Sequence, residues 1–183
     1  MVERISYQDK EVDNLVRKMA DLDLDASYYL LLLAGKNGSA KNQVLNKLKK
    51  ESVDFHAVDL RNIISTVEED AYQNIDELFG NLPESPRHLY LENADVLSGE
   101  YTGFTYSSVR YATPQEKYLL QKIKGSERIV ILEMIDKANI TKALERTAQT
   151  AIECDLPTGF FSKLKQIKVH GHTFENKRPA DVR

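Results

Sequence analysis

The feature that most constrains the fold is an uninterrupted apolar run that leads into a glycine-containing loop. The run extends from Tyr28 to Leu33, and Gly35 follows after a single alanine. A strand without a polar face is buried on both sides, as in a parallel sheet that is covered by helices. A helical pattern begins near Lys41 and places Val44 and Leu48 on one face. This order of strand, loop and helix predicts a layered α/β domain.

The loop after this strand carries part of a phosphate-binding pattern. In G-x-x-x-x-G-K-[ST], backbone N–H groups at a helix N-terminus face the anion, and the lysine reaches the outer phosphates. Gly35 and Lys41 hold the first glycine and the lysine. Ala40 replaces the second glycine, and Asn42 replaces the hydroxyl residue that ligates Mg²⁺. The candidate cofactor-binding residues are Gly35, Gly38, Ala40, Lys41 and Asn42. The alternative is an ordinary turn before a helix, in which Lys41 is a solvated first-turn lysine.

Composition argues against several classes of function. The 183 residues carry a net charge of −3, which gives no electrostatic case for nucleic acid as the main partner. No apolar run is as long as a membrane span, and the N-terminus lacks a signal-peptide pattern, so no membrane partner is expected. Cys154 is the single cysteine, which suits a reducing compartment and predicts a cytoplasmic protein. The four histidines are scattered apart from one pair, so no metal site is expected.

The remaining pattern alternates strands with helices. An amphipathic helix is expected over Ser6 to Ala20, with Ser6 as its N-cap. Two capping-box sequences, Thr66–Glu69 and Thr113–Glu116, predict two further helix starts. Further strands are expected over 53–60, 88–91, 128–132 and 150–154, and a short helix is expected over 140–147.

This alternation predicts a three-layer α/β fold around a five-stranded parallel sheet, with the strand that begins near Tyr28 in a central position. One domain is expected over 1–157, including the helix at 6–20. A short C-terminal extension is expected over 158–183.

A family resemblance appears at the third expected strand. The sequence HLYLENADVLSG, from His88 to Gly99, resembles the Walker B segment of AAA+ ATPases, an apolar strand that ends in Asp-Glu-Ala-Asp. Arg110-Tyr111-Ala112 with Tyr118 to Gln121 is similar to a signature of one AAA subgroup. Ile129 to Pro157 is similar to the family's sensor-1 strand, the short helix before the arginine finger and the last strand. The resemblance extends over roughly 28–157 and implies a P-loop NTPase-like domain with strand order 5-1-4-3-2.

The sequence departs from this family at the positions that carry catalysis. Glu92 stands where the resemblance implies the Walker B aspartate, and Asn93 stands where it implies the glutamate that polarises water. Ile135 falls at the usual sensor-1 asparagine. Arg146 matches the first of two paired arginines, the finger, whereas Thr147 replaces the second. These substitutions predict a degenerate AAA-like module with no catalytic residues.

Three functions follow from this resemblance. The chain is a non-hydrolysing binding or assembly partner, a weak or atypical ATPase of the AAA family that remodels or assembles protein complexes, or a nucleotide sensor without turnover. The first is favoured, so no cofactor is required, and ATP or ADP with Mg²⁺ is expected to bind weakly if it binds. The residues after Pro157 are too few for the family's helical lid. The expected partner is another protein, bound through the Gly99–Tyr111 loop or the C-terminal tail.

Overall fold

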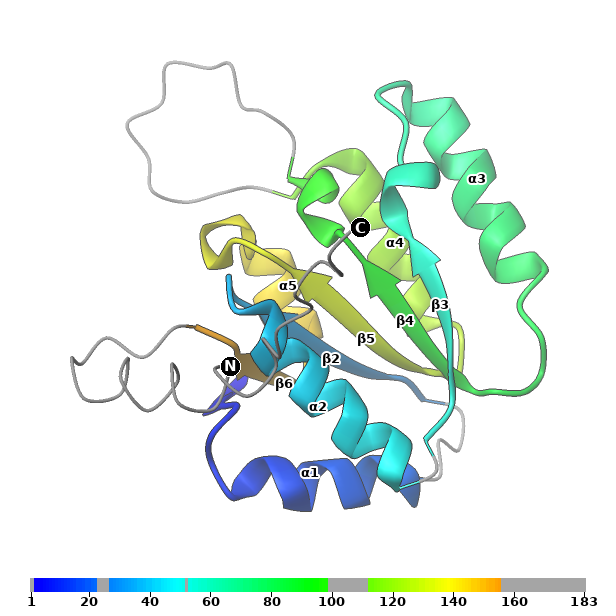
Figure 1. Cartoon of the computed structure of the whole chain (residues 1–183). Helices are drawn as coiled ribbons and strands as arrows, with labels where there is room; N and C mark the ends of the chain where they lie inside the picture. Colours follow the sequence, from blue (N-terminus) through cyan, green and yellow to red (C-terminus); the bar gives the residue numbers. More distant parts are fainter. Residues whose placement is uncertain (1, 23–26, 52, 99–111, 156–183) are drawn as a thin grey trace, which may run out of the picture.

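The computed structural model describes residues 2–22, 27–51, 53–98 and 112–155, and it has one parallel β-sheet between two layers of helices (Figure 1). Helices α1 (Glu11–Ala20) and α2 (Gly38–Lys50) cover one face of the sheet. Helices α3 (Glu68–Gly80), α4 (Pro114–Lys124) and α5 (Lys142–Thr147) pack against the other face. The expectation of an α/β fold with a parallel sheet is therefore confirmed.

The sheet has six strands in the order β1-β6-β2-β5-β4-β3, and every neighbouring pair is parallel. In that order the strands cover Glu3–Ser6, Thr150–Glu153, Tyr29–Ala34, Ile129–Met134, His88–Glu92 and Phe55–Asp59. The expectation of five strands is wrong, and the order of the whole sheet differs from the expected one. The difference is β1, which is added at one edge, because the five expected strands keep their expected order among themselves.

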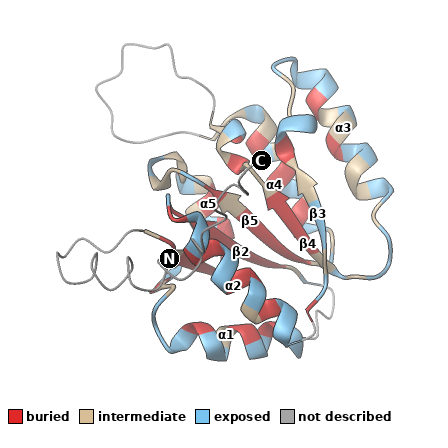
Figure 2. Cartoon of the chain, viewed as in Figure 1, coloured by how far each residue is buried: buried red, intermediate tan, exposed pale blue. Residues whose placement is uncertain are grey.

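Strand β2 contributes side chains to the hydrophobic cores on both faces of the sheet. All six of its residues are buried, and Figure 2 shows the same for the centre of the sheet. Leu30 and Leu32 belong to the core beneath α3, α4 and α5, whereas Leu31 and Leu33 belong to the core beneath α1 and α2. Each fully buried leucine stabilises the fold by about 1.5–3 kcal/mol relative to an exposed one. The two-sided burial predicted from the apolar run is confirmed.

Strand β1 replaces the start of an expected helix. Ser6 is its last residue, and α1 begins only at Glu11, so the expected N-cap at Ser6 is wrong. The Ser6 N–H donates to Asp9 Oδ2 at 2.7 Å, which closes a turn between the strand and the helix. β1 pairs with β6 from the far end of the chain, and this contact stabilises an extended segment that has little local signal of its own.

The two expected capping boxes have different outcomes. Thr113 caps α4, because its Oγ1 accepts a hydrogen bond from the Glu116 N–H at 3.1 Å. The reciprocal bond is not formed, since the Glu116 side chain is buried against Thr141, the N-cap of α5. The box at Thr66 is wrong, because α3 begins at Glu68 and has no side-chain cap.

The domain bounds expected at 1–157 stay a prediction. The segments 99–111 and 158–183, which were named for partner binding and for the missing lid, lie outside the described residues. Within the described ranges, no helix has both the length and the apolar character needed to cross a membrane.

Candidate functional site

The candidate site lies where the parallel strands end, because the loops after β2, β4 and β5 meet at the same edge of the sheet. In open α/β folds this edge is the usual place for ligands. The structure brings most of the predicted residues to this edge, but it gives several of them partners within the protein.

Gly35 is required by the packing of the backbone. Its φ of +138° favours glycine, and a Cβ at this position would lie 2.2 Å from the carbonyl oxygen of Cys154. The Gly35 N–H donates to Met134 O at 3.1 Å, and the Asn37 N–H donates to Cys154 O at 2.9 Å. The glycine therefore lets the end of β2 pass close to the residue after β6, whether or not a phosphate binds.

Helix α2 begins earlier than the sequence predicted. Asn37 is its N-cap, and its Oδ1 accepts from the Ala40 N–H at 3.1 Å, while its backbone carbonyl accepts from the Lys41 N–H at 3.2 Å. Gly38 is already the first helical residue, so the expected start near Lys41 is wrong. The segment between β2 and α2 is reduced to residues 35–37, and two N–H groups that a phosphate loop would offer to an anion are bonded to Asn37.

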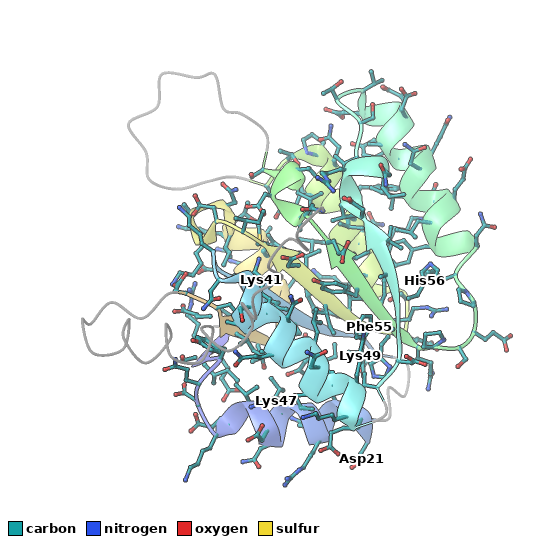
Figure 3. All side chains as sticks on the ribbon, viewed as in Figure 1. Asp21, Lys41, Lys47, Lys49, Phe55 and His56 are labelled. Carbon is teal, nitrogen blue, oxygen red and sulfur yellow. The ribbon has the colours of Figure 1, made fainter. Side chains whose placement is uncertain are left out.

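Lys41 has an internal counterion. Its side chain extends from α2 toward the carboxyl ends of the strands (Figure 3), and the residue is only 4% exposed. The Nζ atom lies 2.7 Å from Oε1 of Glu133 on β5. The other carboxylate oxygen, Oε2, accepts from the Tyr90 hydroxyl at 3.1 Å. Burial, together with the charge of Glu133, raises the pKa of Tyr90, so this hydroxyl stays protonated and donates.

Asn42 does not share the environment of Lys41. Its side chain is exposed on α2, whereas Lys41 is buried. Successive helical residues are separated by about 100° around the axis, so neighbours in the sequence face different ways. The position that would supply the Mg²⁺ ligand is directed at solvent.

The Walker B positions are connected to the outer strand β3. Glu92 ends β4 and aligns with Asp59 of β3. Asn93 has a left-handed backbone with φ of +58°, and its Nδ2 donates to Asp59 Oδ1 at 3.0 Å. Arg61 pairs with the same carboxylate, with Nη2 2.5 Å from Oδ2, and its hydrogen bonds hold the pKa of Asp59 well below the usual range. Asn93 therefore takes part in a polar network with β3.

Asp95 holds two loops of the site edge together. Its Oδ2 accepts from the Ile135 N–H at 2.6 Å. Its Oδ1 accepts from the Asp136 N–H at 3.0 Å and from Asn139 Nδ2 at 2.7 Å. Ile135, at the sensor-1 position, is exposed. These bonds give Asp95 a structural role, and the side-chain amide that donates to it comes from Asn139, which sequence analysis did not identify.

Arg146 is exposed on α5, and within the described ranges it has no ion pair. Thr147, which stands at the second arginine position, is buried. The structure therefore leaves the arginine-finger prediction untested. Cys154 is buried, and burial raises the pKa of its thiol to about 12, as expected for an unreactive core cysteine.

Sequence analysis missed Glu133 and Tyr90, although one signal was present. Glu133 interrupts the apolar sequence of a buried strand, and a charge in such a place needs a partner. Its partner could not be read from the local sequence because Lys41 precedes it by 92 positions. Among the described residues, no group of three or more His, Cys, Asp or Glu side chains is arranged to hold a metal ion.

Comparison with known proteins supports the fold and no more. No protein-family model and no curated protein matches the sequence. Among solved structures 476 chains match, and one belongs to a structure described as "Structural Basis for Katanin Self-Assembly". The TM-score is 0.56 at 16% identity, over 95% of this chain and 59% of that one. This chain therefore spans about three fifths of its solved neighbour, and the likeness is consistent with a P-loop NTPase-like, AAA-like fold.

Proposed function

We propose that this chain is an AAA-like module that binds or assembles with other proteins and does not hydrolyse ATP. The observation that carries the proposal is the ion pair between Lys41 and Glu133. In a working phosphate loop the lysine charge serves the outer phosphates. Here the charge is buried and already compensated, so an incoming phosphate would have to displace a carboxylate of the protein.

Asn93 supports the absence of turnover. An amide takes no proton from water, and the loss of a general base typically lowers the rate by about 10²–10⁴-fold. Phosphoryl transfer also needs Mg²⁺ between the β- and γ-phosphates. The exposed Asn42 offers no hydroxyl for that ion.

One observation favours a second candidate, weak nucleotide or anion binding without turnover. Asn37 is 6% exposed, and its Nδ2 has no hydrogen-bond partner among the described residues. It lies at the N-terminus of α2, where the helix dipole favours an anion. In this second candidate, ATP or ADP with Mg²⁺ would be a ligand of low affinity.

The partner in this proposal is another protein, reached through the Gly99–Tyr111 loop or the C-terminal tail, and the location is the cytoplasm. The description of the solved neighbour speaks of the self-assembly of katanin. A protein-binding role for this chain is compatible with that likeness in fold.

Phosphate release from Mg·ATP tests the proposal. The purified chain is expected to release no phosphate above a protein-free control, and neither ATP nor ADP is expected to raise its melting temperature markedly. A small rise without turnover would favour the second candidate. Turnover that is lost in Lys41→Ala, while circular dichroism shows that the variant is folded, would refute the proposal. The melting temperature of Lys41→Ala must be measured as well, because this substitution leaves the Glu133 carboxylate without its cation and can destabilise the fold.

A further inference from the structure

The two edges of the sheet differ in how they are protected. Edge strands expose unpaired backbone groups, and proteins usually block them with charges, proline or irregular pairing. β1 carries two exposed charged residues, Glu3 and Arg4, and Arg4 pairs with Glu153 at 3.1 Å and with Glu145. β3, at the opposite edge, has regular pairing along its length and contains neither lysine nor proline; its one acidic residue, Asp59, stands at its last position and is paired with Arg61. In the part of the chain that the structure describes, no strand pairs with the outer edge of β3.

Two residues of β3 are exposed, His56 and Ala57, and Figure 3 shows His56 on the outer side of the sheet. Val58 packs against the core beneath α3 and α4, whereas Phe55 packs against the opposite core. Because side chains alternate along a strand, His56 lies on the α3 face together with Val58. The open edge therefore adjoins the space between β3 and α3.

A cavity of about 320 Å³ lies at that place. Its apolar lining comes from three aliphatic residues, Ile63, Leu78 and Leu82. Its polar lining comes from His56, Asn62, Asn74, Glu77 and Asn81. Asn74 Nδ2 donates to Ile63 O at 2.9 Å, which fixes one wall against α3. The volume is at the small end of the roughly 300–1,000 Å³ range of ligand pockets, so it suits one long side chain better than a cofactor.

The charge of this region selects the kind of side chain. α3 contains acidic residues and no basic residue. Asp76 is paired with Lys122 at 2.5 Å, but Glu77, in the cavity wall, has no ion pair among the described residues. Lysine and arginine lay an aliphatic stem along apolar surface and hold a cationic head at the rim. The aliphatic lining and Glu77 match these two parts.

We propose that the open edge of β3 and the adjoining cavity bind an extended, basic segment of a partner protein, with a lysine or arginine side chain in the cavity beside Glu77. The partner's backbone adds a strand to the sheet, and its side chain gives specificity, as in other strand-addition interfaces. This surface differs from the phosphate-loop edge and from the two segments proposed above. This proposal does not depend on whether the chain binds nucleotide.

Designed peptides test the surface by fluorescence anisotropy. The first peptide alternates valine with lysine, the second alternates valine with glutamate, and the third is the lysine peptide with N-methylated backbone amides, which cannot pair with a strand. The lysine peptide is expected to bind the full chain, and the other two are expected to bind at least about fivefold more weakly. Equal binding of the methylated peptide would overturn the role of the β3 edge.

Protein variants test the cavity separately. Glu77→Lys is expected to weaken the binding of the lysine peptide at least about fivefold and to strengthen the binding of the glutamate peptide. Glu69→Gln, on the same helix, is expected to change the affinity for neither peptide. Both residues are exposed, so melting temperatures should stay close to that of the wild type. An unchanged peptide preference in Glu77→Lys would overturn the cavity assignment. Light scattering that shows stable dimers of the wild type, which Ala57→Lys dissociates, would show instead that a second copy covers this edge.

Discussion

Glu133 is the single residue that most changes how the phosphate loop is interpreted. It lies on β5 opposite Leu33 of β2, in a register where its neighbours are buried. Its side chain is 18% exposed and compensates the charge of Lys41. The loop pattern identified Lys41 as the candidate phosphate-binding lysine, and that assignment stays a prediction. It could not predict the counterion, because the pairing depends on which strand lies beside β2.

Replacing Glu133 with glutamine is expected to give the chain an affinity for polyphosphate. The amide keeps the shape of the side chain but leaves the Lys41 charge uncompensated. The loss of stability should be smaller than the ~3–5 kcal/mol typical of a fully buried pair, because Glu133 is partly exposed. Pyrophosphate is expected to raise the melting temperature of Glu133→Gln but not that of the wild type or of Glu84→Gln, an exposed control. The absence of any ligand-dependent shift in Glu133→Gln would contradict an internal-anion role.

At the scale of elements, the accuracy of the sequence predictions follows the amount of local signal. β2, β4 and β5 are apolar runs, and all three were predicted to within a few residues. β1 has four residues, of which only Ile5 is buried, so its existence depends on pairing with β6. The start of α2 was misplaced because Asn37 caps the helix from within the expected loop. Local patterns therefore predicted the buried elements and missed those that tertiary contacts define.

The contact between α4 and α5 should depend on pH through Glu116. This side chain is 1% exposed; Thr141 donates to Oε1, and Oε2 has no partner among the described residues. Burial raises the pKa of Glu116 from 4.5 to about 7, despite the Thr141 hydrogen bond, which lowers it. The folded state therefore favours the protonated acid. Relative to a glutamate that stays protonated, Glu116 leaves the free energy of unfolding unchanged below about pH 4.5 and lowers it progressively between about pH 4.5 and 7. Above pH 7 the destabilisation is constant, at about 3 kcal/mol at most.

Urea unfolding at pH 5.5 and pH 8 measures this contribution. The free energy of unfolding of the wild type, relative to that of Glu116→Gln, is expected to fall between the two pH values, because glutamine does not ionise. Other carboxylates with lowered pKa values, such as Asp76 and Glu153, are present in both proteins and cancel in the comparison. A difference between the two proteins that does not vary with pH would show that Glu116 does not titrate in this range.

At the scale of the whole molecule, the relative order of the five expected strands came from the family resemblance and not from any local pattern. The likeness to a solved chain at 16% identity agrees with that architecture. Physical reasoning from the sequence supplied the buried strands and the layers, but neither the sixth strand nor the internal partners of Lys41 and Asn93. Those features depend on pairings between distant segments, and the loop pattern describes only one side of each pair.

Removing β1 is expected to destabilise the whole domain and to make it self-associate. Without Glu3–Ser6, β6 becomes an edge strand, and its first three residues, Thr150–Ile152, are buried in the intact sheet. An uncovered edge of this kind pairs readily with other chains. A chain that begins at Lys10 should therefore melt at a lower temperature and form dimers or larger species in light scattering. Arg4→Ala keeps the strand but removes its partly exposed ion pairs, so it should cost no more than about 1 kcal/mol and leave the size of the protein unchanged. If the shortened chain melts and scatters like the full one, then β1 contributes nothing to the edge, and the five predicted strands form a sufficient sheet.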